Sequence, residues 1–141
     1  MSEHDDRQAI IDLTTAYCYA LDDRRFEDLA SVFTPDAVAN YDPVVCHGID
    51  EITAKVRGSI EFLDATAHMV ANHRILVEGD KGSCECYLMA QHLRKGTPGG
   101  DLYMIAGRYR DEVARTPQGW RIASRVLTRV WIQGNRAVVT R

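Results

Sequence analysis

The spacing of apolar residues divides the chain into a helical first part and a β-rich second part. Over roughly the first sixty residues, apolar positions recur every three or four places, which is the spacing of one face of an α-helix. This pattern predicts a helix that includes residues 9–21, a short helix over 26–33 and a third helix over 48–63. Pro35 ends the second of these because a proline disfavours helical geometry in the residue before it. Residues 37–41 are predicted to form a short strand.

From Thr66 onward the period changes, and Val, Ile, Leu and Tyr alternate with polar residues. Glycine-containing turns at 79–82, 96–100, 116–119 and 133–135 divide this part into about four long strands, as in an antiparallel meander. Helices followed by such a sheet indicate an α+β fold, with the helices packed on one face. Strands this long must coil around a small core, so we expect a strongly curved, cone-shaped sheet with an interior pocket.

Length and charge narrow the class of protein. The 141 residues with 45% hydrophobic content fit one domain, 1–141. The net charge of −3 argues against nucleic acid as the main partner, and Arg121, Arg125 and Arg129 are too few to make a basic surface. No apolar stretch approaches the roughly 20 residues of a membrane span, and the polar, acidic start does not read as a signal peptide. We therefore expect a cytoplasmic protein with no membrane or nucleic-acid partner.

The four cysteines, Cys18, Cys46, Cys84 and Cys86, lack paired CxxC spacing and sit in mostly apolar surroundings. Such cysteines are typical of reduced core residues. The sequence also has no HExxH, paired-cysteine or acidic-cluster motif for a metal, so we expect neither a metal site nor a cofactor.

Two histidines are candidates for the pocket. On the strand 83–95, the apolar face runs toward His92, whose ring either enters the pocket or lies at a solvated strand end. On the preceding strand, His68 and Asn72 share a face. His73 takes the opposite face, so His68 and His73 can both point inward only if the strand contains a bulge.

Asp22 lies at the predicted end of the first helix, where a carboxylate meets the negative end of the helix dipole. A histidine partner would offset that penalty, and the carboxylate would fix the tautomer and raise the basicity of the ring. Tyr17, on the same helix, could donate a hydrogen bond to a substrate oxygen. The alternative interpretation is a solvated carboxylate, a core histidine and a packing tyrosine.

Several segments resemble the SnoaL-like proteins of the nuclear transport factor 2-like superfamily. They are residues 11–22, 29–37, Thr66-Ala67-His68 with Asn72, Gly107-Arg108-Tyr109 and Gly119-Trp120-Arg121-Ile122. The resemblance covers nearly the whole chain and implies the cone-shaped fold. Its nearest characterised groups are scytalone dehydratase, bile-acid dehydratase and hexachlorocyclohexane dehydrochlorinase, which are lyases that use no cofactor.

The resemblance also implies roles for individual residues. His68 matches the histidine that removes a proton, Asp22 the aspartate of the same dyad, and Tyr17 a position that contacts the leaving group or substrate. Tyr41 and His92 match substrate-binding positions. The lysine that the dehydrochlorinase has at the Tyr17 position is absent, which speaks against halide elimination.

Two more residues complete the expected substrate-binding set. Asn72 shares the His68 face, and Arg125 resembles a pocket arginine of the dehydrochlorinase. Simple alternation, however, places Arg125 with Arg121 and Arg129 opposite Trp120, so that it points outward unless the strand is bulged.

These residues predict a cofactor-independent lyase, a dehydratase-type enzyme acting on a small hydrophobic cyclic substrate. An isomerase or cyclase of polyketide or steroid-like molecules is an alternative on the same fold. A non-catalytic binding or assembly module, like a dioxygenase β-subunit, is another. We also expect a homo-oligomer, a dimer or trimer, built through the outer sheet face with Tyr87, Met89 and Trp131.

Overall fold

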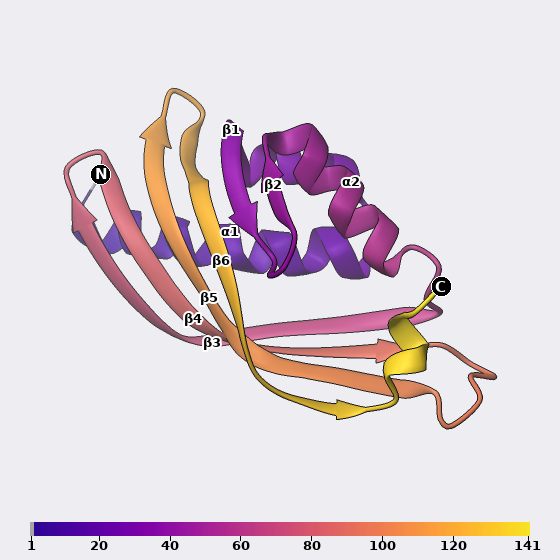
Figure 1. Cartoon of the computed structure of the whole chain (residues 1–141). Coiled ribbons are helices and arrows are strands. Elements are labelled where there is room, and N and C mark those ends of the chain that lie inside the picture. The colour runs from indigo at the N-terminus through magenta and orange to yellow at the C-terminus, as the bar shows by residue number, and fades with distance from the viewer. Residues whose placement is uncertain (1) are drawn as a thin grey trace.

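The structure of the chain is a computed structural model that describes residues 2–141. It contains two α-helices, two short 3₁₀ helices and six strands (Figure 1). In chain order these are α1 (Glu3–Asp22), η1 (Phe26–Ser31), β1 (Phe33–Asn40), β2 (Val45–His47), α2 (Ile49–Ile60), β3 (Ala65–Glu78), β4 (Lys81–Leu93), β5 (Leu102–Thr116), β6 (Gly119–Gly134) and η2 (Arg136–Val139).

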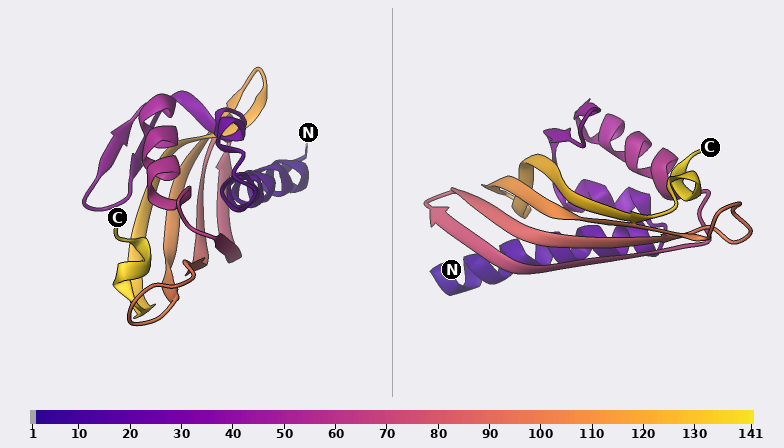
Figure 2. Two further views of the ribbon diagram at one scale, coloured as in Figure 1. Left: turned by 90° about the vertical axis from the view of Figure 1, so that its right-hand side faces the viewer. Right: turned by 60° about the horizontal axis from the view of Figure 1, so that its bottom comes forward.

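The strands form one sheet in the order β2-β1-β6-β5-β4-β3. Neighbouring strands are antiparallel except β1 and β6, which run parallel. Figures 1 and 2 show the four long strands bending strongly, with α1 and α2 on the inner side of the bend. The predicted α+β class, with helices packed on a curved and mostly antiparallel sheet, is confirmed.

Three local features differ from the expectations. The second predicted helix is a 3₁₀ turn that ends at Ser31, and β1 already begins at Phe33. Pro35 lies within β1, at a point where the pairing with β6 shifts register. No regular strand-to-strand hydrogen bond is expected at this point, so the sheet loses none through the missing N–H of the proline. The short strand β2 and the 3₁₀ helix η2 were not predicted, because three or four residues are too few to show a period.

The core lies between the helices and the inner face of the sheet. Both helices bury the faces that the apolar spacing predicted. The buried apolar residues are Ile10, Leu13, Tyr17, Cys18, Ala20 and Leu21 in α1, and Ile52, Val56 and Ile60 in α2. All four cysteines are buried and free, as expected for reduced core residues.

The first helix is fixed to the sheet near its N-terminus. The buried carboxylate of Asp6 accepts two hydrogen bonds from Arg115, each 2.9 Å, and one from the indole of Trp120 at 3.1 Å. These contacts connect α1 to β5 and β6, about 16 residues before the helix ends at Asp22. The helix is thereby held in place across the sheet, and its last residue is delivered to the other end of the fold.

Bulges in β6 decide which side chains face the core. Glu112 pairs with Ser124 while Val113 pairs with Ile122, so one extra residue, Ala123, is inserted. This insertion reverses the alternation and turns Arg125 inward, where it is 1% exposed. The sequence analysis placed Arg125 outward unless the strand is bulged, and the bulge is present, so Arg125 points inward.

A similar bulge interrupts β3. Ala71 pairs with Tyr87 and Arg74 with Glu85, so Asn72 and His73 together oppose a single residue of β4. Asn72 adopts a left-handed backbone conformation with φ +58°, which asparagine tolerates better than most residues. The bulge lets His73 face α1, where its Nε2 lies 2.8 Å from the hydroxyl of Thr14. His68 and His73 thus both face the helices.

Within residues 2–141, none of the helices combines the length and the apolar composition that a membrane-spanning helix requires.

Candidate active site

A cavity of about 100 Å³ lies between the two helices and the concave face of the sheet. An engineered apolar cavity of roughly 150 Å³ accommodates benzene, so this inner space suits at most one small ring. It combines an apolar wall with a few polar side chains, the usual composition of a small-molecule site. The lining residues are Tyr17, Leu21, Tyr41, Lys55, Val56, Ser59, Ile60, His68, Leu88, Ala90, His92, Ile105, Tyr109, Leu127 and Arg129.

The end of α1 brings Asp22 against His68 of β3. Nδ1 of His68 lies 2.7 Å from Oδ1 of Asp22. Because a carboxylate accepts, the proton of a neutral His68 ring lies on Nδ1, and Nε2 keeps its lone pair. The His68 side chain is 5% exposed and lines the cavity. The two residues that the sequence predicted as a dyad are therefore in contact at the cavity wall.

Asp22 is held in place by more than the imidazole. Its Oδ2 accepts the backbone N–H of His68 at 2.9 Å, and its Oδ1 accepts the hydroxyl of Thr66 at 2.9 Å. Arg24 donates to that hydroxyl at 2.9 Å and to the carbonyl of Leu21 at 2.7 Å. Burial opposes ionisation of Asp22, but the hydrogen bonds from His68 and Thr66 outweigh it and lower the pKa of this carboxyl. Asp22 is thus an oriented carboxylate at neutral pH.

A second imidazole, that of His92 on β4, lines the same cavity, with its ring centroid 5.9 Å from that of His68. Its Nδ1 lies 3.0 Å from the carbonyl oxygen of Tyr103, and a carbonyl can only accept. Burial lowers the pKa of His92, although the Tyr103 carbonyl opposes this in part. A neutral ring with its proton on Nδ1 offers Nε2 as an acceptor. The sequence left open whether His92 enters the pocket or lies at a solvated strand end, and the structure places it in the pocket. There the neutral ring is suited to accept a hydrogen bond and not to donate a proton.

Two phenols face the histidines. The hydroxyls of Tyr17 and Tyr41 lie 2.9 Å apart, and both rings line the cavity. Burial raises the pKa of Tyr17, with the charge of Arg125 opposing it, and raises that of Tyr41 well above its ordinary value. Both phenols are therefore protonated at neutral pH. When one donates to the other, the second still has a proton to offer to a bound molecule.

Arg125 lies behind these tyrosines and not in the cavity wall. Its Nε and Nη2 donate to the carboxylate of Asp111 at 2.7 and 2.8 Å, and the side chains are 0% and 1% exposed. The guanidinium lies 4.4 Å from the ring centroid of Tyr17 and 3.8 Å from that of Tyr109. It supports the back of the tyrosines, and direct contact with a bound substrate does not follow from this position.

Asn72 also lies away from the cavity. The β3 bulge displaces it, and its side chain is exposed and absent from the lining. Strict alternation from His68 fails here because the bulge breaks the two-residue period. Of the seven predicted site residues, the cavity brings together Tyr17, Tyr41, His68 and His92, with Asp22 directly behind His68.

The sequence analysis missed two cationic residues of the lining, Lys55 of α2 and Arg129 of β6. A signal existed for Lys55, because it comes three residues after Ile52 and so borders the buried face of its helix. For Arg129 the signal was hidden by the bulge at Ala123, which puts Arg125, Leu127 and Arg129 on the inner face.

The arrangement provides a carboxylate-oriented imidazole, a second imidazole acceptor, two protonated phenols and two cations around a small cavity. Among residues 2–141, no group of three or more His, Cys, Asp and Glu side chains is placed to hold a metal ion. Chemically, these residues can remove a proton from carbon, donate a proton to oxygen and attract an anion.

Comparison with known proteins agrees with this fold. The family described as SnoaL-like domain matches residues 2–126. An uncharacterised protein of Mycobacterium tuberculosis is 35% identical over 133 residues, which cover 92% of this chain and 88% of that protein.

Two solved structures from Novosphingobium aromaticivorans are also similar. A proposed aromatic ring hydroxylase superposes with a TM-score of 0.83 at 26% identity, over 99% of this chain and 100% of the other. A proposed scytalone dehydratase gives 0.82 at 23% identity, over 92% of this chain and 87% of the other.

Proposed function

The chain belongs to the SnoaL-like family, and on that premise we propose that it is a cofactor-independent lyase that eliminates water from a small hydrophobic cyclic substrate. Family membership supports a dehydratase- or isomerase-type activity at the coarser level. The observation that carries the finer proposal is the 2.7 Å contact between Nδ1 of His68 and Oδ1 of Asp22 at the wall of the cavity.

In this proposal His68 is the general base. Its Nε2 removes a proton from a carbon next to a carbonyl or similar activating group, and the C–H electron pair begins to form the new double bond. The ring becomes an imidazolium, which the ionised Asp22 stabilises through the Nδ1–H contact. Asp22 itself keeps its charge, consistent with the lowered pKa of its carboxyl.

The phenols complete the elimination. One hydroxyl of the Tyr17–Tyr41 pair donates a hydrogen bond to the departing hydroxyl or to the activating carbonyl. As the C–O bond breaks, the phenol transfers its proton to the departing hydroxide, which leaves as water, and the imidazolium of His68 then returns the abstracted proton to the phenol. Positioned donors of this kind typically contribute a factor of roughly 10²–10⁴ in rate.

The size and lining of the site support a compact, mostly apolar substrate. The inner cavity of about 100 Å³ limits the part of a substrate that it takes to at most one small ring. Leu21, Val56, Leu88 and Leu127 provide apolar contacts around it, which would exclude water from the base.

The second candidate is isomerisation or cyclisation, which begins with the same proton removal by His68. There the base would return the proton to a different carbon, and no group would leave. The third candidate, a non-catalytic binding or assembly module, draws on the similarity to a proposed aromatic ring hydroxylase. It does not require the oriented His68.

Proton removal can be tested before the substrate is identified. We would incubate the protein in D₂O with a panel of small ring ketones and β-hydroxy ketones, and follow C–H exchange and product mass. We expect deuterium incorporation next to the carbonyl, and loss of one water from the productive hydroxy compound. His68→Ala should abolish both, whereas His47→Gln, which changes an exposed histidine, should change neither.

The outcomes separate the three candidates. Exchange with an unchanged product mass and a moved double bond would assign the isomerase instead. Binding by the wild type and His68→Ala alike, with no exchange in either, would overturn the enzymatic proposal and favour the binding module.

A further inference from the structure

The cavity continues into an outer pocket that contains an unbalanced group of cations. This outer pocket has a volume of about 410 Å³ and shares Lys55, Ser59, Ile60, His92, Ile105 and Arg129 with the inner cavity. Lys55, Arg129 and Arg136 line it, and of the residues that the structure describes, Asp42 alone adds a carboxylate to the lining. Within residues 2–141, no carboxylate lies within 4.0 Å of any of these three cations.

Two of the cations are held in position by neutral groups. Nη1 of Arg129 donates to the carbonyl oxygens of Tyr41 and Asp42 at 3.0 and 2.7 Å. Nζ of Lys55 donates to the hydroxyl of Ser59 at 2.7 Å. Carbonyl and hydroxyl oxygens orient a cation without neutralising it, so both side chains retain their charge and part of their hydrogen-bonding capacity.

The unused edge of Arg129 has a specific shape. Within residues 2–141, its Nε and Nη2 have no hydrogen-bond partner, and these two N–H groups lie along one edge of the guanidinium. The same edge binds a carboxylate twice elsewhere in the molecule, in Arg125–Asp111 and in Arg110–Glu85. Parallel N–H groups of this kind match the two oxygens of a carboxylate.

Two like charges in one partly enclosed space repel each other. Burial lowers the pKa of Lys55, and the nearby charge of Arg129 lowers it further. In a chain with net charge −3, such a local excess of positive charge is relieved when an anion binds.

From this geometry we propose that Lys55 and Arg129 form a carboxylate-binding subsite, and that the substrate of the His68 site is a ring compound bearing a carboxylate. The inference rests on the proposed function for the word substrate, but the binding site stands on its own contacts. The ring would occupy the inner cavity next to His68, and the carboxylate would lie at the junction with the outer pocket, between the edge of Arg129 and Nζ of Lys55.

Matched ligand pairs test the proposal. Binding of cyclohexanecarboxylate and cyclohexanecarboxamide, and of benzoate and benzamide, would be measured by calorimetry or ligand-observed NMR at low salt. We expect each carboxylate to bind at least about tenfold more tightly than its amide. Lys55→Gln and Arg129→Gln should each remove most of that preference. Arg57→Gln, the same charge change on an exposed residue of α2 that does not line either pocket, should leave it intact.

Comparing acid with amide within each variant removes any general effect on folding. Equal binding of acid and amide by the wild type would overturn the subsite, as would an unchanged preference in both variants. Deuterium exchange on neutral ring ketones would then leave the proposed lyase intact. Conversely, the protein could prefer carboxylates through Lys55 and Arg129 but catalyse no deuterium exchange. That result would support the binding subsite and contradict the proposed lyase activity.

Discussion

Two carboxylates of the molecule are paired in different ways, Asp22 with the imidazole of His68 and Asp111 with the guanidinium of Arg125. In the buried pair, both side chains are at most 1% exposed and Asp111 receives the Nε–Nη2 edge of Arg125. In the cavity pair, Asp22 is 24% exposed, and His68 is bound through one ring nitrogen only. Arg125 thus has its carboxylate-binding edge occupied, whereas Nε2 of His68 remains available.

Burial and charge alone therefore do not identify a site. Arg125 is the more deeply buried ion, yet it supports Tyr17 and Tyr109 from behind. What distinguishes Asp22–His68 is hydrogen-bonding capacity that remains unused on a residue lining the cavity, whereas the unpaired Nη1 of Arg125 belongs to a residue outside the lining. The same criterion identifies Arg129, whose Nε–Nη2 edge is unused.

The largest effect should come from disabling the cavity pair. Asp22→Asn keeps an oxygen that can accept from Thr66 or the His68 backbone but offers an uncharged partner to the ring. We expect turnover to fall by about a thousandfold or more, because the imidazolium loses its counter-charge and the tautomer is no longer fixed. The melting temperature should stay close to that of the wild type. A variant that retains full turnover would show that Asp22 is structural.

The buried pair should respond in the opposite way. Asp111→Ala leaves the Arg125 charge buried without its carboxylate, so we expect the free energy of unfolding to fall by about 3–5 kcal/mol. Urea denaturation measures this. Glu85→Ala, which removes a carboxylate from the exposed Arg110, is the matched control and should change stability little. Equal effects of the two substitutions would contradict the distinction drawn here.

A smaller effect concerns pH. Burial lowers the pKa of both His92 and His73, so the unfolded chain binds their protons at a higher pH than the folded protein does. We expect the free energy of unfolding to decrease as the pH falls below about 6.5 and through the lowered folded values. Denaturation midpoints at neutral pH and near pH 5 would measure it. The double variant His73→Gln with His92→Asn should flatten that dependence, and an equally steep loss in this variant would assign it to other groups.

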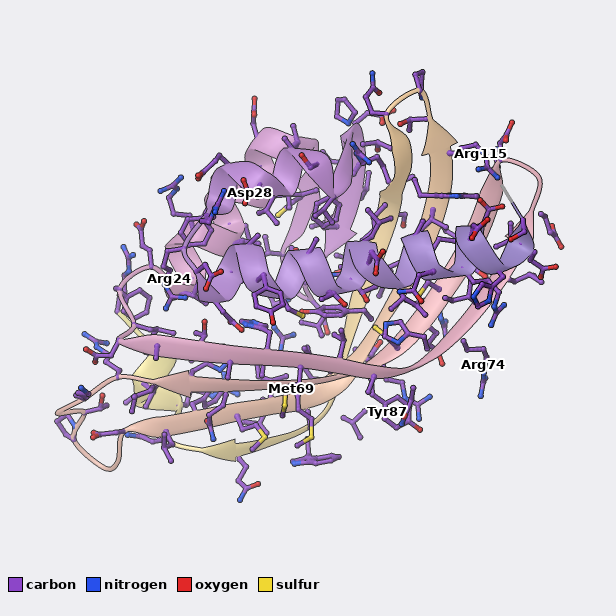
Figure 3. All side chains as sticks on the ribbon, turned by 180° about the vertical axis from the view of Figure 1, so that it is seen from behind. Arg24, Asp28, Met69, Arg74, Tyr87 and Arg115 are labelled. Carbon is purple, nitrogen blue, oxygen red and sulfur yellow. The ribbon has the colours of Figure 1, made fainter. Side chains whose placement is uncertain are left out.

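The smallest effect on the proposed chemistry is expected from substitutions on the outer face of the sheet. Figure 3 shows Tyr87 on the side of the sheet away from α1. Tyr87, Met89 and Trp131 are 46%, 37% and 53% exposed, a large apolar surface for a single copy of the chain. We predict a dimer or trimer that uses this face. Light scattering should give a multiple of the 15.9 kDa chain mass, and Trp131→Arg should yield monomer with an intact dyad.

The sequence alone predicted the elements whose apolar residues recur with a clear period, and the residues whose position called for a specific chemical partner. The amphipathic spacing located α1 and α2, the turn glycines delimited the long strands, and the placement of Asp22 at a helix end called for a partner such as His68. To predict the His68–Asp22 contact, the position of β3 relative to α1 must also be known. Only the family resemblance provided that position.

The side chains that were assigned to the wrong face share one physical cause. Alternation along a strand can be extrapolated only until an extra residue breaks it, and no local composition marks Ala123 or Asn72 as such a point. Asn72 therefore lies outside the expected face, and Arg125 and Arg129 lie inside it. The tautomer of a histidine ring cannot be predicted from residue spacing either, because it depends on a single hydrogen-bond acceptor such as the Tyr103 carbonyl beside His92.

The bulge at Ala123 also has an evolutionary consequence. A second register shift in β6 lies at Val130, because Ala106 pairs with Trp131 while Gly107 pairs with Arg129. Between the two shifts, the inner face carries Arg125, Leu127 and Arg129. Removing one residue at either point would exchange the inner and outer side chains of a whole segment at once. Diversification of pocket chemistry in this part of the fold is therefore open to insertions and deletions of a single codon, which alter several contacts together. Point substitutions would have to change those contacts one at a time.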